Sequence, residues 1–492
     1  MSLISVNNLT FAHEGSYINV FDNVSFQIDT DWKLGFTGRN GRGKTTFLNL
    51  LLGKYEYKGT ISANVDFEYF PYKVEHEDYL TIDIIREIAS NVEDWKIFKE
   101  INLLDADDDI LYRQFCTLSK GEQTKAMLAA LFLKENAFLL IDEPTNHLDA
   151  DAREKLSQYL ANKKGYILVS HDRYFLDNCV DHILAINKTN IVVCKGNFSQ
   201  WWENKERQDS SELAENEKLK GDIKRMAVSA KRTSDWSDSI EKSKKGTTNS
   251  GSKLDKGYVG HKAAKMMKRA KNIEARQNEK IEQKSTLLKN IETADSLKIK
   301  PINFYNDTLA EFVDVAVFYG GKTVLDKVNF KICQGDRIAL KGKNGCGKSS
   351  LIKLLCGEDI THTGELRKSD RLIISYVSQI TDNLYGNLSA FADNHGIDES
   401  LFKAILRKLD FTREQFDNNI EDFSGGQKKK VLIAKSLCEK AHLYVWDEPL
   451  NFIDVISRMQ IEELLLRFQP TIIFVEHDRT FVGNIATRVI EL

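Results

Sequence analysis

The chain is poor in proline and contains no long uninterrupted apolar run. Only 5 of its 492 residues are proline and 42% are hydrophobic, a composition typical of folded domains rather than of a disordered polypeptide. No stretch reaches the roughly 18 consecutive apolar residues that a membrane-spanning helix requires, and the N-terminal residues lack the basic and apolar pattern of a secretory signal. The sequence therefore predicts a protein that is neither inserted into a membrane nor exported.

Cysteine is also sparse, and its distribution argues against two kinds of site. The seven cysteines are odd in number, scattered along the chain and without the paired spacing of zinc ligands. We therefore expect reduced thiols in the cytoplasm rather than disulfide bonds or a structural metal. These residues are Cys116, Cys179, Cys194, Cys333, Cys346, Cys356 and Cys438.

The segment 218–271 differs in charge from the rest of the chain. It holds 16 Lys and Arg against 5 Asp and Glu, a net charge of +11, so the remaining residues carry −14 within a total of −3. Apolar residues recur at helical spacing over 219–230 and again over 266–291. Between these stripes, residues 244–253 are small, polar or basic, as in an exposed loop. The pattern predicts an antiparallel helical hairpin with this loop at its tip.

Basic and aromatic side chains near the loop indicate a contact with nucleic acid. The lysines and arginines can neutralise phosphates, and aromatic rings such as those of Trp236 and Tyr258 offer faces on which unpaired bases can stack. We interpret the hairpin as a probe for folded RNA. Two other interpretations stay open, a solvated pair of helices and a dimerisation coiled coil. The residues expected to make the tip contacts are Lys244, Lys245, Lys253, Tyr258 and Val259.

Two stretches, 38–45 and 342–349, match the phosphate-binding loop pattern G-x-x-x-x-G-K-[ST]. Each follows a strand-like apolar run and precedes a helix-like one, which is the context that the pattern requires. The glycines let backbone N–H groups approach phosphate oxygens, the lysine reaches the terminal phosphates, and the hydroxyl holds Mg2+. The nucleotide-binding candidates are Gly38, Asn40, Gly41, Gly43, Lys44, Thr45 and Thr46 in the first loop, and Gly342, Asn344, Gly345, Gly347, Lys348, Ser349 and Ser350 in the second.

Further motifs occur in the same order in both halves of the chain. Four pairs of equivalent residues are separated by 304, 305, 305 and 306 positions, and this agreement indicates a duplicated domain. The pairs are Lys44 and Lys348, Ser119 and Ser424, Asp142 and Asp447, and His171 and His477.

Together these motifs resemble those of ATP-binding-cassette (ABC) ATPases. The shared features are the phosphate loop, a Ser-x-Gly signature, an apolar strand that ends in Asp-Glu-Pro, and a single histidine further on; they cover about 400 of the 492 residues. The resemblance implies an α/β fold with two tandem ABC-type P-loop ATPase domains joined by a long α-helical hairpin linker. The expected limits are 1–203 for the first ATPase domain, 204–300 for the basic linker and 301–492 for the second ATPase domain.

In such ATPases the two cassettes stack head to tail, and each ATP lies between the phosphate loop of one cassette and the signature of the other. Site one would thus combine the first loop with the second signature, and site two the reverse, with ATP and Mg2+ as ligands. Glu143 and Glu448 would orient or deprotonate the attacking water, while His171 and His477 would contact the γ-phosphate. The other implied nucleotide contacts are Ser119, Gly121, Gln123, Asp142, Gln379, Ser424, Gly425, Gly426, Gln427 and Asp447. The implied metal-holding residues are Thr45, Asp142, Ser349, Gln379 and Asp447.

The two halves also depart from one another. Gln379 matches the glutamine that usually contacts metal and water in this family, whereas the equivalent residue of the first half is Tyr72. Lys120 stands where the first signature would have a glycine. We therefore expect unequal sites, without an indication of which is slower. The aromatic residue that stacks on adenine is also open, with Phe11 and Tyr319 as candidates.

Two cassettes joined by a long basic hairpin, without a membrane segment, resemble the F group of these ATPases (ABC-F), which act on ribosomes. The spacing from Lys44 to Ser119 is 75 residues and that from Lys348 to Ser424 is 76, so the first cassette lacks the extra arm of housekeeping members. Only 15 residues follow His477, which leaves no room for a C-terminal coiled coil. This combination resembles the Lsa-type antibiotic-resistance proteins.

The resemblance implies a partner and a function. The partner would be the bacterial 70S ribosome, with 23S rRNA and tRNA near the exit and peptidyl sites. We expect a monomer whose cassettes pair within the chain, with no membrane and no stable protein partner. The protein would bind in the tRNA exit site in ATP, where the linker tip displaces lincosamides, pleuromutilins or streptogramin A. Three alternatives stay open: a housekeeping translation factor of the same group, the ATPase subunit of a transporter, and a DNA-associated ATPase.

Overall fold

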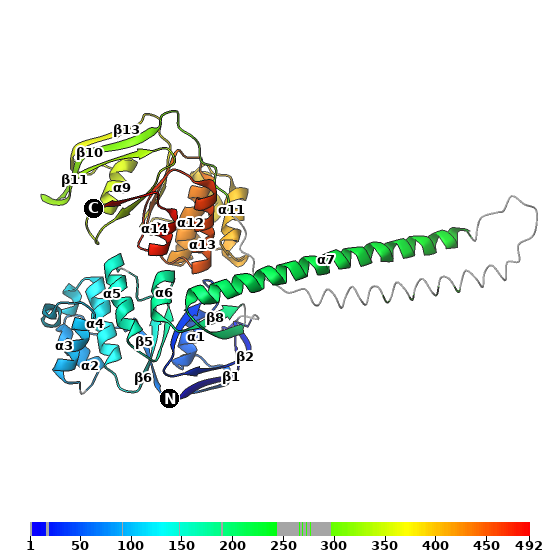
Figure 1. Ribbon diagram of the computed structural model, residues 1–492, viewed down its shortest axis with the longest axis horizontal. Helices are drawn as coiled ribbons and strands as arrows, with labels where there is room; N and C mark the ends of the chain where they lie inside the picture. The colour runs from blue at the N-terminus through cyan, green and yellow to red at the C-terminus, as the bar shows by residue number, and fades with distance from the viewer. Residues whose placement is uncertain are drawn as a thin grey trace, which may run out of the picture. The chain divides into compact units, whose positions relative to one another are not determined.

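The computed structural model shown in Figure 1 describes most of the chain. The described residues are 2–15, 19–90, 92–146, 148–187, 190–243 and 297–492, together with Lys265, Lys268, Asn272 and Arg276. By its internal contacts the chain divides into two units, Met1–Trp201 with Ala294–Leu492, and Trp202–Thr293. The five expected tip residues and most of the second helical arm lie outside the described residues, so the hairpin stays a prediction. These tip residues are Lys244, Lys245, Lys253, Tyr258 and Val259.

The first half of the chain forms two sheets. One is antiparallel with strand order β2-β1-β4, and the other has the order β5-β6-β7-β3-β8-β9, parallel except for the pair β8 and β9. The strands are β1 (Leu3–Phe11), β2 (Phe21–Asp29), β3 (Lys33–Thr37), β4 (Lys58–Ser62), β5 (Asp66–Phe70), β6 (Ala137–Asp142), β7 (Tyr166–Val169), β8 (His182–Asn187) and β9 (Asn190–Lys195). The helices are α1 (Lys44–Leu51), α2 (Thr81–Ile88), α3 (Asp94–Leu103), α4 (Lys120–Phe132), α5 (Ala150–Ala161) and α6 (Arg173–Cys179), with short 3-10 turns at Asp108–Tyr112 and Phe115–Thr117.

The second half repeats this arrangement. Its antiparallel sheet has the order β11-β10-β13, and its parallel sheet the order β14-β15-β16-β12-β17. The strands are β10 (Thr308–Tyr319), β11 (Lys322–Cys333), β12 (Arg337–Lys341), β13 (His362–Lys368), β14 (Ile374–Val377), β15 (Leu443–Asp447), β16 (Ile472–Val475) and β17 (Arg488–Glu491). The helices are α9 (Lys348–Cys356), α10 (Leu388–Asn394), α11 (Glu399–Lys408), α12 (Gly425–Cys438), α13 (Val455–Phe468) and α14 (Arg479–Ile485), with 3-10 turns at Glu414–Phe416 and Ile420–Asp422.

The matching strand orders explain where the motifs meet. In both halves the strand before the phosphate loop (β3 or β12) lies beside the strand before the histidine (β7 or β16), and the strand that ends in Asp-Glu-Pro (β6 or β15) is next. Because these strands are parallel, their carboxyl ends share one edge of the sheet, which is where ligands bind in open α/β sheets. The predicted tandem α/β fold is confirmed.

The core of each half explains why the parallel strands are apolar throughout. Both faces of such a sheet are covered, so side chains that point either way are buried. In the first half, Phe36, Leu140 and Ile167 are fully buried, and they cluster with Phe47 and Leu48 of α1. This packing fixes α1, and with it the phosphate loop that leads into the helix. An equivalent cluster forms around α9 in the second half.

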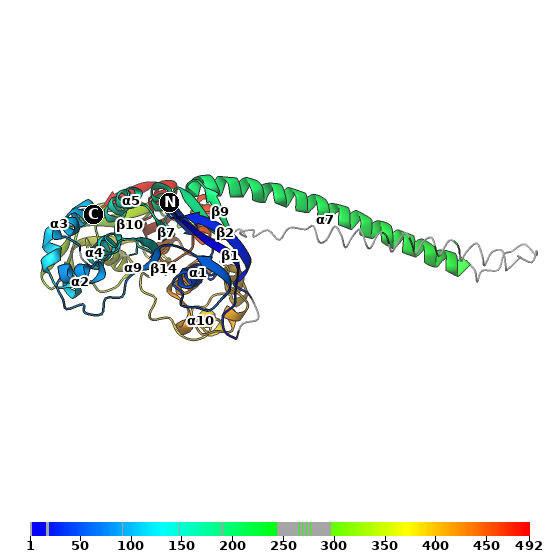
Figure 2. The same cartoon turned by 90° about the horizontal axis from the view of Figure 1, so that it is seen from below.

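A helical group in each half presents the signature motif. Helices α2, α3 and α4 lie together in both views (Figure 1, Figure 2), and α2 buries Ile82, Ile85 and Ile88, at spacings that place them on one face. Helices α10, α11 and α12 form the equivalent group around Leu388, Phe402 and other buried residues. The signatures are the first turns of α4 and α12, so this packing positions them.

The basic segment begins on a long helix, α7 (Phe198–Ser243). Its 46 residues span about 70 Å at roughly 1.5 Å per residue. Leu219, Ile223 and Met226 of the predicted stripe lie on α7 and are half-buried, whereas the neighbouring Val228 is exposed. No helix among the described residues is long and apolar enough to cross a membrane.

Candidate nucleotide-binding sites

The first phosphate loop connects β3 to α1. Gly43 precedes the helix with a φ of 98°, and a Cβ at this position would lie 2.6 Å from Cγ1 of Val20, so only glycine fits. Lys44 is buried, and its Nζ donates hydrogen bonds to the carbonyl oxygens of Gly38 at 2.7 Å and Arg39 at 3.2 Å. Burial lowers the pKa of Lys44. The lysine thus lies inside the loop, at the place where a phosphate would bind.

The second loop, between β12 and α9, has the same construction. Gly347 adopts a φ of 99°, and Nζ of Lys348 donates to the carbonyl oxygens of Gly342 and Lys343, both at 2.8 Å. Tyr319, one of the two candidates for adenine stacking, lies at this loop with its hydroxyl 3.1 Å from Oγ of Ser350. The other candidate, Phe11, is buried against His13 and Tyr55.

The aspartates at the ends of β6 and β15 meet the hydroxyl residues of the loops. Oγ1 of Thr45 donates to Oδ2 of Asp142 at 3.3 Å, and Oγ of Ser349 donates to Oδ1 of Asp447 at 3.2 Å. Burial raises the pKa of Asp142, and it raises the pKa of Asp447 to about 6. Tyr69, which the sequence did not single out, also donates to Oδ2 of Asp142 at 3.0 Å.

The two glutamates that follow these aspartates have different surroundings. Nε2 of His171 lies 3.4 Å from Oε1 of Glu143, and Nε2 of His477 lies 3.6 Å from Oε1 of Glu448. Burial, aided by Asp142, raises the pKa of Glu143 to about 8.

Partial burial by itself raises the pKa of Glu448, but hydrogen bonds from His477 and Gln379 and the positive charge nearby outweigh this effect and lower the pKa to about 2. Asn451, another residue that the sequence did not single out, donates from Nδ2 to Oε2 of Glu448 at 2.6 Å. Glu448 therefore has more hydrogen-bond partners than Glu143, and it carries its negative charge at neutral pH.

The signatures are capped helix starts. Ser119 caps α4, where Oγ accepts from the backbone N–H of Glu122 at 3.3 Å and the Glu122 carboxylate accepts from the N–H of Ser119 at 2.7 Å. Ser424 and Gln427 form the same reciprocal pair on α12. Gln123, which the resemblance implies as a nucleotide contact, is buried, and its Nε2 donates to the carbonyl oxygen of Phe115. Its nucleotide role stays a prediction.

Contacts between the halves bring the second signature to the first phosphate loop. Nδ2 of Asn40 donates to the carbonyl oxygen of Phe452 at 3.0 Å, and a Cβ on Gly426 would lie 3.4 Å from the same nitrogen. Nη1 of Arg39 forms an ion pair with Asp410 at 3.1 Å. Site one thus combines a loop of one half with a signature of the other.

Site two is a cavity of about 510 Å³. Residues of the second half line it, including Lys348, Ser349 and Gln379, and the first half contributes Leu148 and Arg153. Of the described residues, Ser119 and Gly121 do not line this cavity, so the first signature is not brought to the second loop in the way that Gly426 is brought to the first.

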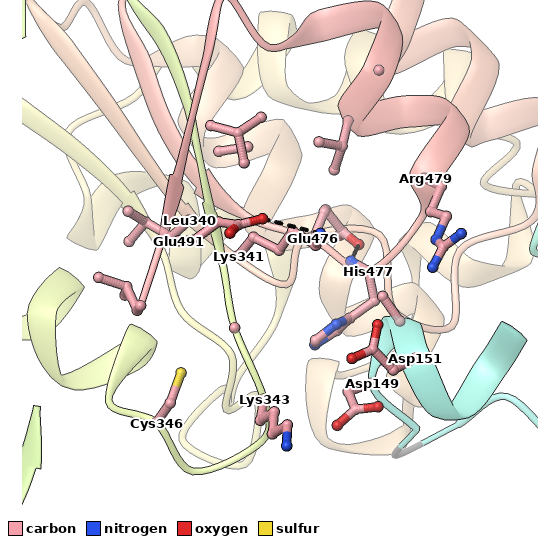
Figure 3. Close-up of a pocket in the computed structure, with 17 residues that line it drawn as sticks. Asp149, Asp151, Leu340, Lys341, Lys343, Cys346, Glu476, His477, Arg479 and Glu491 are labelled. Atoms are coloured by element: carbon pink, nitrogen blue, oxygen red, sulfur yellow. Dashed lines mark hydrogen bonds and ion pairs between the residues drawn. The ribbon is translucent and has the colours of Figure 1, made fainter. Parts of the chain in front are cut away.

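A larger cavity of about 960 Å³ lies beside the second loop (Figure 3). Its walls include Lys343 from the loop, His477, and Asp149 and Asp151 from the first half. His477 lines both cavities.

Two ion pairs also join the halves near the histidines. Arg173, two residues after His171, pairs with Glu462, and Arg479, two residues after His477, pairs with Glu154 at 2.6 Å. The first pair is largely buried, while the second is more than one third exposed. Each histidine loop is thereby linked to a helix of the opposite half.

Two phosphate loops, each followed by an aspartate, a glutamate and a histidine at one edge of a parallel sheet, define a duplicated P-loop ATPase. The family described as "ABC transporter" matches residues 21–146 and 325–451, which is 253 of the 492 residues. The chain therefore belongs to the ABC family, and its domains bind and hydrolyse ATP.

Similar proteins span nearly the whole chain. The ribosome protection protein VmlR of Bacillus subtilis is 27% identical over 500 residues, which covers 98% of this chain and 85% of that protein. The energy-dependent translational throttle protein EttA of Haemophilus influenzae is 24% identical over 527 residues, covering 96% and 89% respectively. A solved complex of an archaeal ribosomal stalk protein with the recycling factor aABCE1 matches with a TM-score of 0.61 at 18% identity, over 98% of this chain and 87% of that one, and shows the same fold.

Proposed function

We propose that this protein binds ribosomes in ATP and protects them from antibiotics of the peptidyl-transferase centre, namely lincosamides, pleuromutilins and streptogramin A. The observation that carries the proposal is a nucleotide site built across two cassettes, in a chain that inserts a strongly basic segment between them. The likeness to VmlR, named as a ribosome protection protein, over 98% of the chain supports the protection part of this proposal. The proposed limits are 1–203 and 301–492 for the cassettes and 204–300 for the linker.

The residues around each phosphate loop suit a magnesium nucleotide. Oδ2 of Asp447 is buried and has no hydrogen-bond partner among the described residues, which fits an oxygen that a ligand would satisfy. Thr45 and Asp142 would hold Mg2+ in site one, and Ser349, Asp447 and Gln379 in site two. When bound, the ion neutralises charge on the phosphates. Lys44 and Lys348 would leave their carbonyl partners for the terminal phosphates.

The protein's own groups would then perform hydrolysis. Glu448, held by Asn451 and close to His477, would orient a water molecule and accept its proton, and Glu143 would do so in site one. Ser424 and Gly426, which begin α12, would present backbone N–H groups to the γ-phosphate in site one. ATP would thus hold the halves together, and its hydrolysis would release them and the ribosome.

Trapping the closed state tests this cycle. A chain with Glu143→Gln and Glu448→Gln should sediment with 70S ribosomes in ATP, because it closes but does not hydrolyse. A matched chain with Lys44→Ala and Lys348→Ala should not sediment, since its phosphate loops lose their grip. Equal sedimentation of the two chains, or none with the glutamine variant, would refute the ATP-gated part of the proposal.

Drug susceptibility separates protection from a general role in translation. The likeness to EttA, named as a translational throttle, makes a translation factor the second candidate. Expression in a sensitive host should raise the inhibitory concentrations of the three drug classes, while the Lys44→Ala, Lys348→Ala chain should not. Ribosome trapping without any change in susceptibility would favour the translation factor. Stimulation of ATP hydrolysis by DNA, or co-purification with a membrane protein, would favour the remaining alternatives.

A further inference from the structure

Tyr69 and Tyr376 occupy equivalent places in the two halves. On β5, Tyr69 lies opposite Leu140 of β6, two residues before Asp142; on β14, Tyr376 lies opposite Val445 of β15, two residues before Asp447. Each tyrosine also stands three residues before the position held by Tyr72 or Gln379. The two tyrosines thus have equivalent backbone positions relative to the aspartate of their own half.

The two hydroxyls nevertheless behave differently. Tyr69 donates to Oδ2 of Asp142 at 3.0 Å, and Thr45 donates to the same oxygen at 3.3 Å. In the second half, Ser349 donates to Oδ1 of Asp447, and Oδ2 of Asp447 has no partner within the described part of the chain. Oδ2 of Asp142 therefore accepts two hydrogen bonds, whereas Oδ1 of Asp447 accepts one.

This difference bears on metal-nucleotide binding. A carboxylate oxygen has two lone pairs, so the hydrogen bonds from Tyr69 and Thr45 occupy both on Oδ2 of Asp142. A water molecule bound to Mg2+ that donated to this oxygen would have to displace one of them. Site one also has Tyr72 in place of Gln379, and Oε1 of Glu143 has no hydrogen-bond partner among the described residues, whereas Glu448 is held by Asn451.

We propose that Tyr69 is a positioning residue that competes for Asp142 and makes site one the slower site, in which ATP is held while site two turns over. The proposal rests on the metal-holding roles given to Asp142 and Asp447 above. Its physical basis is the hydrogen bond from Tyr69 to Asp142, which has no counterpart from Tyr376. This hydrogen bond would explain why the two sites are unequal and which of them is slower.

Magnesium dependence of nucleotide binding tests the competition directly, without ribosomes. In a chain with Lys348→Ala, which keeps site one, Tyr69→Phe should lower the Mg2+ concentration needed for half-maximal binding of a fluorescent ATP analogue by about tenfold, the scale of one hydrogen bond to a charged group. In a chain with Lys44→Ala, which keeps site two, Tyr376→Phe should change it by less than about twofold. An unchanged or higher Mg2+ requirement with Tyr69→Phe would overturn the proposal.

Turnover provides the second measurement. With Glu448→Gln silencing site two, Tyr69→Phe should speed hydrolysis of ATP at site one. With Glu143→Gln silencing site one, Tyr376→Phe should leave the rate at site two nearly unchanged. A slower site one after Tyr69→Phe would show that the hydroxyl supports Asp142 and would refute the competition. Failure of the parent chains to bind the analogue would instead refute the assigned nucleotide sites, so the two failures are distinguishable.

Discussion

Nδ2 of Asn40 in the first phosphate loop donates a hydrogen bond to the carbonyl oxygen of Phe452, 3.0 Å away in the second half of the chain. Phe452 follows the Asp-Glu-Pro motif of that half by three residues, so the contact joins the loop of one cassette to the catalytic loop of the other. Gly426 of the second signature lies against the same carbonyl oxygen. Asn40, Phe452 and Gly426 therefore form one joint at site one.

The first prediction concerns Gly426 in this joint. A Cβ at position 426 would lie 2.4 Å from the Phe452 carbonyl oxygen, and this backbone atom cannot turn aside as a side chain can. We expect Gly426→Ala to displace the Phe452 loop and reduce ATP turnover by about 10- to 100-fold, the cost of a displacement near 1 Å in a catalytic site. The measurement is the steady-state ATPase rate of the purified chain.

Gly121→Ala is the matched comparison in the first signature. Its Cβ would meet only the flexible Leu148 side chain at 3.3 Å, so we expect a loss well below that of Gly426→Ala. Equal losses would show that the signature glycines act through a common contact with nucleotide, and not through the joint at Phe452.

The second prediction compares the two ion pairs that join the halves. Arg173 and Glu462 retain side-chain exposures of only 12% and 10%, whereas Arg479 and Glu154 retain 38% and 37%. Removing one partner of a buried pair leaves the other charge uncompensated, while exposed pairs are worth about 1 kcal/mol or less. We expect Arg173→Ala to weaken apparent ATP affinity by about tenfold or more, and Arg479→Ala by less than about fivefold.

The measurement is closure of the two halves as ATP is added. Closure is detected by energy transfer between dyes placed on the two cassettes. Melting temperatures of both variants serve as the control for general loss of stability. If Arg479→Ala weakened closure as much as Arg173→Ala, burial would not govern the strength of these links.

Duplication is the reason that the sequence predicted the tandem fold. A motif that occurs once says little, but Lys44, Ser119, Asp142 and His171 recur with nearly constant offsets, and the paired halves do have the same strand order. The head-to-tail partners in site one also follow from the family pattern. The nucleotide and metal roles of individual residues stay predictions.

Other features depend on register and loop geometry, which spacing does not determine. Tyr69 contacts Asp142 because of how β5 pairs with β6, and Asn451 reaches Glu448 because of the turn after β15. Glu122 is a different case, since Ser-x-x-Glu at a helix start is a recognisable capping pattern that was visible in the sequence. Counting three residues on from Ser119 identifies Glu122 as the residue that pairs with the signature serine.

The third prediction concerns a buried ion pair that positions the helices of the second half. Nζ of Lys430 lies 2.8 Å from Oδ2 of Asp454, and both side chains are almost fully buried. We expect Lys430→Met to lower the free energy of unfolding by about 3–5 kcal/mol, because it strands the Asp454 carboxylate. The equivalent Lys125→Met should cost less, since Lys125 bonds to the carbonyl oxygen of Asp105 and no buried carboxylate depends on it. Denaturant unfolding measures both.

The same pair makes stability depend on pH. Burial raises the pKa of Asp454, but Lys430 outweighs this and holds it well below its ordinary value. A depressed pKa in the folded state stabilises the fold above the ordinary aspartate pKa of about 4, and this contribution is lost as the pH falls below that value. The difference in unfolding free energy between the parent chain and Lys430→Met should therefore shrink in acid. A constant difference down to about pH 3 would contradict the assigned ion pair.

The fourth prediction concerns the basic linker, through Lys244, Lys245 and Lys253, which lie outside the described residues. If these lysines contact phosphates of folded RNA, each contact releases counterions on binding. Changing all three to serine should weaken ribosome binding in ATP and reduce the slope of log affinity against log salt by roughly 2 to 3 units. Sedimentation of the Glu143→Gln, Glu448→Gln chain with ribosomes across a salt series measures the slope.

The control for this experiment is the same charge change on the cassettes. Lys73, Lys164 and Lys440 are exposed, and changing them to serine alters net charge equally. Because neither the phosphate loops nor the linker contains them, we expect a slope change below about 1 unit. Equal slopes for the two triple variants would mean that overall charge, rather than the linker tip, drives the attraction, and would remove the linker's proposed role as an RNA probe.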